Sequence, residues 1–365
     1  MFDTIHSARW LSQFDNQSLE FLLFPSSPHR RVHPELEGSL SCSGAAAFRL
    51  SPHARYFALP LWVLDKFAND YFRGWLLRAA IRKFQPDIIH SLELQNAGYV
   101  TPRALSVDKS KSLKLIVTNW GSDMFWFQRF PKHKAKLQKL LQLAGSYSAE
   151  CERDIVLAKN LGFTSQAVPV IPIAGGFSEA DLTIPRIDSS ERKVFALQGY
   201  HGWVGRAKVS LEAVREMSEE LGDYKIVVYS AHRSVLELAR QVAKQTGLEI
   251  TAFGKGAMSH KQVLEMFAKS KIYVGLSQSD GISTSMLEAM AMDAIPVQTS
   301  TACCDEWFGD GGVAVHEIKV PAVKNAIGEG LKLAEDPANA DKNLETIKAR
   351  ASVEMVKKVA LTFYD

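Results

Sequence analysis

The sequence has little of what marks several large protein classes. Its 365 residues include only four cysteines, whose spacing fits neither a zinc site nor a disulfide framework, so we expect reduced thiols, a cytoplasmic location and no metal. No apolar run approaches the roughly 18 residues that a membrane span needs. The polar, charged start MFDTIHSARW is unlike a signal peptide. The net charge of +3 gives no basic field for a nucleic-acid partner. The cysteines are Cys42, Cys151, Cys303 and Cys304.

Two frequent enzyme motifs are also missing. No nucleophile elbow of the G-x-S-x-G type is present, which argues against a Ser-His-Asp hydrolase. The stretch GYHGWVG at 199–205 is not the G-x-G-x-x-G that a dehydrogenase places after its first strand. With no His/Cys cluster for a metal, we expect neither a metal nor another cofactor.

The order of apolar and amphipathic segments predicts an α/β protein. Short apolar runs alternate with helical periodicities, which is typical of parallel sheets covered on both faces by helices. The length suits two domains, and the Gly-, Pro- and Ser-containing stretch Ile173–Glu191 reads as a linker. We therefore predict two Rossmann-like domains that face a cleft, residues 1–182 and 183–365, with a C-terminal helix that crosses back.

The start of the chain is unusual for such a domain. Residues 3–14 have the pattern of an amphipathic helix, and the first apolar strand candidate is Phe21–Phe24. Either the fold begins unusually, or a first strand and its loop are missing. The other predicted strands are Ile88–His90, Leu115–Thr118, Ala167–Ile171, Val194–Leu197, Lys225–Tyr229, Glu249–Ala252, Ile272–Leu276, Ile295–Val297 and Val313–Val315. Helices are predicted at Asp65–Phe84, Lys132–Leu143, Glu150–Leu161, Lys208–Glu220, Ser234–Thr246, Lys261–Ala268, Ser283–Met292 and Val320–Glu335.

The segment 276–297 carries the chemistry. A strand ends at the polar loop Ser277–Gly281, and a helix opens at Ser283 with a run of hydroxyl side chains. The unpaired amides and the dipole of a helix start attract a phosphate. Glu288 lies about one and a half turns into this helix, where its carboxylate could accept two hydrogen bonds from a ribose diol. The alternative is a capped helix with a surface glutamate.

At this point the sequence resembles a known family. SDGISTSMLEAMAMDAIPV is similar to the glutamate–seven–glutamate region of the family-four (group 1) retaining glycosyltransferases, which have the GT-B fold. The resemblance implies that Glu288 binds the donor ribose and that Asp280, which stands where the family has a glutamate, is catalytic near the transferred sugar. It also implies donor contacts from Gly281, Ile282, Ser283, Thr284 and Ser285.

A second match covers FALQGYHGWVGRAKVSLEAV, residues 195–214. It implies that Gly205, Arg206 and Lys208 bind the donor, and that Arg206 is catalytic. Fixed cations there would neutralise the departing nucleoside diphosphate without a metal. The alternative is two exposed basic residues at a helix start.

Weaker matches in the first half concern the acceptor. LIVTNWGSDMFWF has Trp120 where the family has a histidine, but Gly121, Ser122 and Asp123 match, and Arg153 lies in a third matching stretch. The resemblance implies that Trp120, Ser122, Asp123 and Arg153 contact the acceptor. The alternative for the aromatic residues is core packing.

Together these features predict transfer of a sugar from a nucleoside-diphosphate sugar to a saccharide or lipid-linked acceptor hydroxyl, with retention, in polysaccharide biosynthesis. A nucleotide-sugar epimerase of the same architecture, or a degenerate protein that binds nucleotide sugar without catalysis, would share the donor motif. The basic amphipathic stretch Arg129–Leu141 suggests peripheral contact with the anionic inner face of a membrane; its alternative is a solvated helix face.

Overall fold

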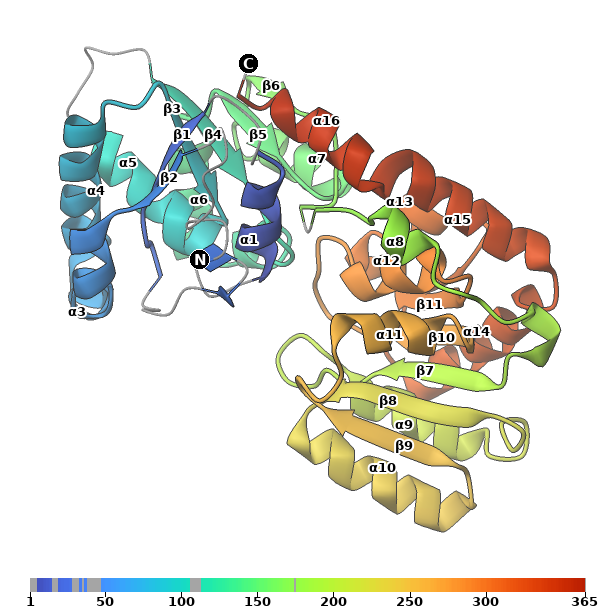
Figure 1. Cartoon of the computed structure of the whole chain (residues 1–365). Coiled ribbons are helices and arrows are strands. Elements are labelled where there is room, and N and C mark those ends of the chain that lie inside the picture. The colour runs from blue at the N-terminus through green and yellow to red at the C-terminus, as the bar shows by residue number, and fades with distance from the viewer. Residues whose placement is uncertain are drawn as a thin grey trace. The chain divides into compact units, whose positions relative to one another are not determined.

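The computed structural model describes residues 5–14, 19–27, 33–34, 36–37, 47–105, 113–173 and 175–364. The chain forms two compact units (Figure 1). Unit 1 contains residues 1–176 together with 353–365, and unit 2 contains residues 177–352. The α/β class predicted from the sequence, with parallel sheets in two Rossmann-like units, is confirmed.

Unit 1 is built on a parallel sheet whose described strands have the order β3-β4-β5-β6. A second parallel pair is formed by β1 and β2. The strands are β1 (Glu20–Leu23), β2 (Ala47–Leu50), β3 (Ile88–Leu92), β4 (Lys114–Thr118), β5 (Ser146–Ser148) and β6 (Gln166–Ala167). The helices are α1 (Ile5–Ser12), α3 (Pro52–Ala68), α4 (Tyr71–Phe84), α5 (Tyr99–Leu105), α6 (Pro131–Leu141), α7 (Glu152–Asn160) and α16 (Val353–Leu361), with the short turns η1 (Leu94–Gly98) and η2 (Phe127–Arg129).

Alternation along β4 explains why helices cover both faces of this sheet. Leu115 and Val117 point into one core, which is filled by α5, α6 and α7. Ile116 points to the opposite face, into a core shared with Trp10 of α1 and Val356 of α16. Successive strand side chains face opposite ways, so a continuous apolar run of this kind needs cover on both sides.

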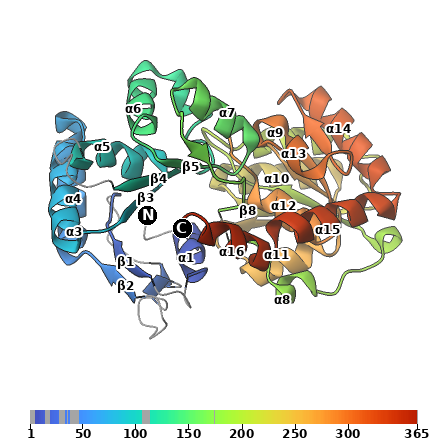
Figure 2. The same ribbon diagram turned by 90° about the horizontal axis from the view of Figure 1, so that it is seen from above.

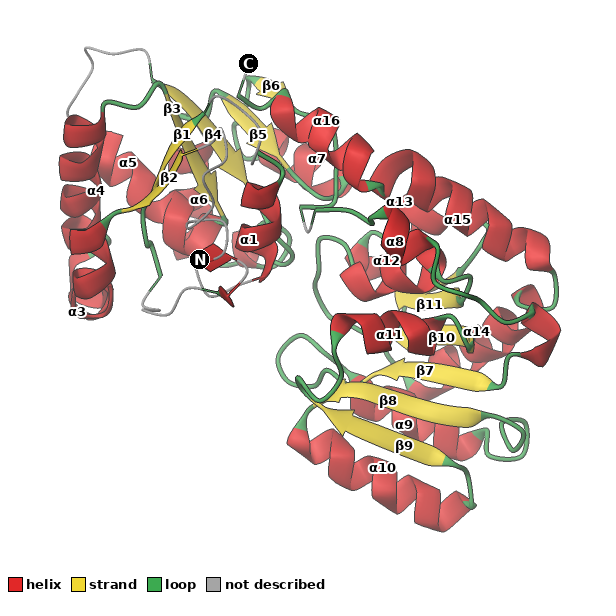
Figure 3. Ribbon diagram, in the orientation of Figure 1, coloured by secondary structure: helices red, strands yellow, loops and turns green. Residues whose placement is uncertain are grey.

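Unit 2, every residue of which is described, has one parallel sheet in the order β12-β11-β10-β7-β8-β9 (Figure 3). Its strands are β7 (Val194–Gln198), β8 (Lys225–Ala231), β9 (Ile250–Gly254), β10 (Ser270–Gly275), β11 (Ile295–Thr299) and β12 (Val313–Val315). Its helices are α8 (Glu179–Leu182), α9 (Ala207–Glu216), α10 (Arg233–Thr246), α11 (His260–Phe267), α12 (Thr284–Ala291), α13 (Asp305–Phe308), α14 (Val320–Leu333) and α15 (Pro337–Ala351), with turns η3 (Ser189–Glu191) and η4 (Ser300–Ala302). This strand order is that of a Rossmann fold.

The structure differs from the sequence-based expectations in several places. The predicted boundary after residue 182 falls at the end of α8, inside unit 2, and residues 353–365 belong to unit 1. The helix predicted at Asp65–Phe84 is two helices, because Asn69 and Asp70 both adopt left-handed backbone conformations between α3 and α4. The strands β2 and β5 were not predicted. Cys42 lies outside the described residues.

The leucines of α6 correct another expectation. Leu137, Leu140 and Leu141 are fully buried in the core of unit 1. The apolar side of this basic helix therefore packs against protein. Lys132, Lys134 and Lys139 are exposed to solvent, while Lys136 pairs with the buried carboxylate of Asp70. Membrane contact through the leucines of this segment, as the sequence suggested, is excluded by the packing.

A cavity of about 460 Å³ lies inside unit 1. Residues of β1 and of β3 both line it, together with Trp10 and Tyr364. Among the described residues, β1 pairs only with β2 and β3 only with β4, so no described strand joins the two sheets.

The helix predicted at the start of the chain is present as α1.

Candidate functional site

The sheet of unit 2 has a topological switch point between β7 and β10. These two strands are neighbours, yet the chain runs from β7 outward to β8 and β9, and returns to add β10 on the other side. The loops that follow β7 and β10 therefore diverge at the carboxyl ends of adjacent strands. Open α/β sheets bind ligands at such a point.

Hydrogen bonds lock these two loops together. The amide of Arg206 donates to the carbonyl of Leu276 over 2.9 Å, and the amide of Gln278 donates to the carbonyl of Val204 over 2.9 Å. Gly205 and Ser277 form an isolated antiparallel bridge between them. The two sequence motifs, which lie some 70 residues apart in the chain, therefore meet at one edge of the sheet.

Gly205 is required by this close approach. A Cβ atom at this position would lie 2.3 Å from the carbonyl oxygen of Tyr200, a backbone atom that cannot swing away. Gly199 is similarly confined, since its Cβ would lie 2.5 Å from the Cα of Ala231. The first and last glycines of GYHGWVG thus serve a tight turn around the switch point.

Helix α12 begins at the second loop. Ser283 is its N-cap, and the Ser283 hydroxyl accepts a hydrogen bond from the amide of Met286 over 3.2 Å. Thr284 and Ser285 occupy the first turn and are half-buried. Amides of a first turn have no acceptor inside the helix, so they and the helix dipole can attract an anion. Asp280 precedes the helix, and its carboxylate accepts from the amide of Gly281 over 3.0 Å.

Glu288 lies one turn further along α12 and is buried, with 7% of its surface exposed. Its carboxylate oxygen Oε1 is 3.0 Å from the imidazole Nε2 of His260, the first residue of α11. The sequence reasoning missed His260, because no spacing rule links it to the motif 28 residues away. The burial excludes the reading of Glu288 as an ordinary surface residue.

The two predicted cations have different surroundings. The guanidinium of Arg206 donates to the carbonyls of Gly202 over 2.6 Å and Gly205 over 2.9 Å, and also to the side chain of Gln278. Arg206 therefore ties its own loop to the neighbouring one. Lys208 is half-buried, and no described residue forms an ion pair with it. The acceptors of Arg206 are neutral groups, so both side chains keep a full positive charge that could face a phosphate.

The loop after β7 carries a positive field. The pKa of His201 is lowered by burial and then by the positive charges of Lys208 and Arg206. A neutral imidazole at this position leaves the two cations as the charged groups of the loop. Such a field favours a diphosphate over a neutral ligand.

In unit 1, the carboxylate of Asp123 is hydrogen-bonded to backbone amides of nearby residues. Its carboxylate oxygen Oδ2 accepts from the amide of Leu94 over 2.9 Å and from the amide of Trp120 over 3.1 Å. Burial and the nearby carboxyl of Glu93 raise its pKa well above the ordinary value. This side chain holds the turn after β4 against the start of η1. Any contact with an acceptor hydroxyl would compete with those two bonds.

The other predicted acceptor residues surround that turn. Ser122 is half-buried, and its carbonyl accepts from the amide of Trp126 over 3.1 Å. The guanidinium of Arg153 lies over the ring of Phe125, 4.0 Å from its centroid, and its Nε donates to the buried carboxylate of Asp154 over 2.9 Å. These residues are near the carboxyl ends of β4 and β5, where a ligand of unit 1 would bind.

Two buried carboxylates at this edge were missed. Glu93 follows β3 with a φ of 78°, a strained value for a residue other than glycine, and its carboxylate accepts from the amide of Asn96 over 3.0 Å. Glu150 follows β5 and accepts from the amide of Gly121 over 3.3 Å. Glu93 lies three residues after the predicted strand Ile88–His90, which was the available signal. Glu150 stood at the start of a predicted helix, with no strand predicted directly before it.

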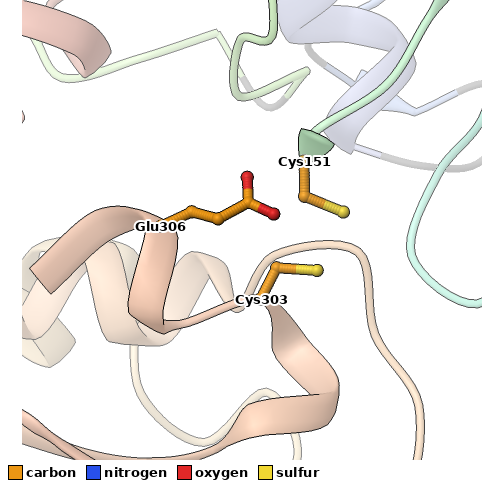
Figure 4. A group of neighbouring side chains, drawn as sticks. All are labelled: Cys151, Cys303 and Glu306. Atoms are coloured by element: carbon orange, nitrogen blue, oxygen red, sulfur yellow. The ribbon is translucent and has the colours of Figure 1, made fainter. Parts of the chain in front are cut away.

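A thiol and a carboxylate lie close together in unit 2. The sulfur of Cys303 and a carboxylate oxygen of Glu306 lie within 4.8 Å of one another at the start of α13 (Figure 4). Zinc sites use three or four protein ligands. Two groups alone do not build one, so we assign this pair no metal; the expectation that the protein needs no metal stays a prediction.

The structure thus defines a Rossmann-type unit in which the predicted donor residues meet at the switch point. Comparisons with known proteins give the family. Residues 189–346 match the model of the glycosyl transferases group 1, and residues 61–150 match that of the glycosyl transferase 4-like proteins. The chain belongs to the group 1 glycosyltransferases and has their GT-B fold. No curated protein matches the chain by sequence.

Solved structures with the same fold are distant in sequence. An alpha,alpha-trehalose 6-phosphate synthase from Burkholderia multivorans has a TM-score of 0.66 at 11% identity, over 82% of this chain and 76% of that one. A trehalose-6-phosphate protein from E. coli bound with UDP-2-fluoro glucose has a TM-score of 0.63 at 13% identity, over 80% and 76%. A TarM variant from S. aureus in complex with fondaparinux, alpha-GlcNAc-glycerol and UDP has a TM-score of 0.58 at 13% identity, over 79% and 58%.

Among the described residues, no helix has the length and apolar character required to cross a bilayer.

Proposed function

We propose that this glycosyltransferase takes a sugar from a nucleoside-diphosphate sugar and transfers it, with retention, to a hydroxyl of a saccharide or a lipid-linked acceptor. The observation that carries the proposal is the buried carboxylate of Glu288 beside the N-terminus of α12, at the switch point of unit 2. One group suits a ribose diol and the other suits a diphosphate. Proteins of similar fold hold UDP or a UDP sugar, which supports a donor of this class.

The chemistry of the transfer step is the basis on which we assign roles to the charged residues. The bond between the anomeric carbon and the terminal phosphate oxygen breaks, a bond from the acceptor oxygen to that carbon forms on the same face, and the acceptor proton leaves with the diphosphate. Negative charge grows on the phosphate. Lys208 and the start of α12 stabilise that charge, while Arg206 holds the loop that presents Lys208. We propose that Asp280 lies beside the transferred sugar and is catalytic there.

For the acceptor we propose the carboxyl edge of unit 1. Trp120 and Ser122 belong to the turn that Asp123 secures, and Arg153 of α7 lies over the ring of Phe125 in the same turn, which supports this proposal. An indole and a guanidinium suit a sugar ring and its hydroxyls. We further propose that the protein acts in the cytoplasm, peripherally at an anionic membrane surface that presents a lipid-linked acceptor.

A transfer assay tests the proposal. UDP-, GDP- and dTDP-sugars that carry a labelled sugar are incubated with the protein and with saccharide and lipid extracts, and the anomeric configuration of the labelled product is read by NMR. We expect label in the acceptor with the configuration of the donor. Lys208→Ala should lower kcat about a hundredfold, because it removes a group that acts on developing charge.

Lys225→Ala is the matched control. Lys225 begins β8 at the amino edge of the same sheet and pairs with Glu249 at the surface, so its loss should leave kcat unchanged. Label that stays in an altered donor sugar would point to an epimerase. Donor binding without turnover across the acceptor panel would point to a non-catalytic binding protein, and either result would overturn the proposal.

A further inference from the structure

Helix α3 exposes an apolar face. Its outward positions are occupied by Tyr56, Phe57, Leu59, Val63, Leu64 and Phe67, and the neighbouring α4 adds Tyr71 and Trp75. At about 100° per residue, the exposed positions of α3 fill one half of its circumference. Phe67 is 90% exposed and Trp75 is 62% exposed. Contiguous exposed apolar surface of this kind marks an interaction site.

The two helices lie side by side at one edge of unit 1 (Figures 1 and 2). Their acidic residues point inward. Asp65 accepts from the amide of Phe72 over 2.8 Å and from Nε of Arg73 over 2.8 Å, and Asp70 accepts from Arg73 over 2.6 Å. Both carboxylates are buried. Among the described side chains of α3 and α4, no acidic group therefore reaches the surface.

The exposed charges of this face are positive. Lys66 lies over the ring of Trp62, 4.1 Å from its centroid, and is exposed among the aromatic residues. Arg82 and Lys83 are exposed in the last turn of α4. Exposed aromatic and aliphatic side chains with cations and without acids are typical of helices that lie in the interface of an anionic bilayer.

We propose that the α3–α4 face docks on an anionic lipid bilayer and holds unit 1 at the membrane surface. This inference refines the membrane contact that is part of the proposed function, and it assigns that contact to a surface whose apolar groups are exposed, unlike the buried leucines of α6. The charge pattern argues for lipid as the occupant. A second copy of the chain would bring like-charged cations together at the same face.

Vesicle flotation tests the inference in the absence of nucleotide. The probes are vesicles of phosphatidylcholine alone and of phosphatidylcholine mixed with phosphatidylglycerol. We expect the protein to float with the anionic vesicles. The double variant Phe67→Ser/Trp75→Ser should lower the partition coefficient at least about tenfold, because two exposed aromatic groups lose their burial in the interface. Arg82→Ala/Lys83→Ala should lower it by about fivefold or more on anionic vesicles, but not on neutral ones.

The matched control removes equally exposed apolar groups elsewhere on unit 1. Leu143 is 45% exposed and Val156 is 54% exposed, so Leu143→Ser/Val156→Ser should bind vesicles like the wild type. Failure of the wild type to float, or equal flotation of the Phe67/Trp75 variant, overturns the inference. So does a dimer that the Phe67/Trp75 variant dissociates while vesicle binding is unchanged.

The same experiment separates this inference from the proposed function. Donor binding measured on the Phe67/Trp75 variant should be unchanged, because both residues lie in unit 1 and the donor loops lie in unit 2. Flotation of the wild type without any sugar transfer would contradict the proposed function and support the docking surface. Transfer to a soluble acceptor without flotation would support the proposed sugar transfer and contradict the docking surface.

Discussion

The sharpest prediction concerns the replacement of Glu288 by alanine. The carboxylate is buried, and one of its oxygens is 3.0 Å from the imidazole of His260, so it is held in place before a ligand arrives. A hydrogen bond to a charged group contributes about 1.5–3 kcal/mol. We therefore expect Glu288→Ala to weaken binding of the nucleoside diphosphate by about 2 kcal/mol or more, roughly thirtyfold in Kd. Glu288→Gln keeps the shape and one acceptor, and should lose about 1 kcal/mol.

Calorimetric titration without an acceptor measures this loss. The ligand is whichever of UDP, GDP and dTDP binds most tightly, and its counterpart without ribose hydroxyls is titrated in parallel. If the carboxylate binds the diol, the counterpart should bind wild type and Glu288→Ala equally. Thermal unfolding of each variant checks that the fold persists after His260 loses its partner.

A carboxylate on the neighbouring helix gives the control. Glu265 lies on α11, and its carboxylate is 3.9 Å from the surface amine of Lys261. Glu265→Ala should leave Kd unchanged. Unchanged binding by Glu288→Ala would refute the assignment, as would an equal loss of affinity for the ligand that lacks the diol.

Three further outcomes are expected. Gly205→Ala should lower the free energy of unfolding, measured in urea, by at least about 2 kcal/mol, because its Cβ would lie 2.3 Å from the Tyr200 carbonyl oxygen. Gly328→Ala in α14, where an added Cβ would meet no neighbouring atom within 4 Å, should raise it by about 0.5–1 kcal/mol. The opposite order of the two variants would contradict the packing argument. Burial lowers the pKa of His90 to about 3, from about 6.5 in the unfolded chain, so its contribution to stability is complete above pH 6.5 and is lost as pH falls towards 3. Between about pH 7 and 4.5, the free energy of unfolding of the wild type should therefore fall by roughly 2 kcal/mol more than that of His90→Gln. Parallel pH curves for the two proteins would show that this group does not titrate as inferred. His260→Ala should weaken donor binding by about 1 kcal/mol, less than Glu288→Ala, in the same titration; a larger loss would make His260 the primary contact.

Much of the fold could be predicted because the local pattern is strong. Buried parallel strands such as β10 and β11 are continuous apolar runs, and the helices between them have a clear periodicity. The first half was harder. β2 is only four residues long. The break between α3 and α4 depends on the left-handed backbone of Asn69 and Asp70, and no proline or glycine at these positions indicates it in the sequence.

The donor motif could also be predicted, since its groups are close in sequence. Ser283 and Glu288 are placed by the geometry of one helix, and one strand and one turn fix where that helix starts. The roles of Arg206 and Lys208 could not be separated in this way. Which cation is tied to carbonyl groups depends on how the loop after β7 folds against the loop after β10.

The sequence by itself determined the α/β class, the nucleotide motif at α12 and the family resemblance, because each depends on residues within a turn or two of one another. Only the tertiary structure decided which surfaces are available. It buried the leucines of α6, turned Asp65 and Asp70 inward, and left Phe67 and Trp75 in solvent. The physical reason is that periodicity shows that a helix has an apolar face, but only the packing of distant segments decides whether that face is covered.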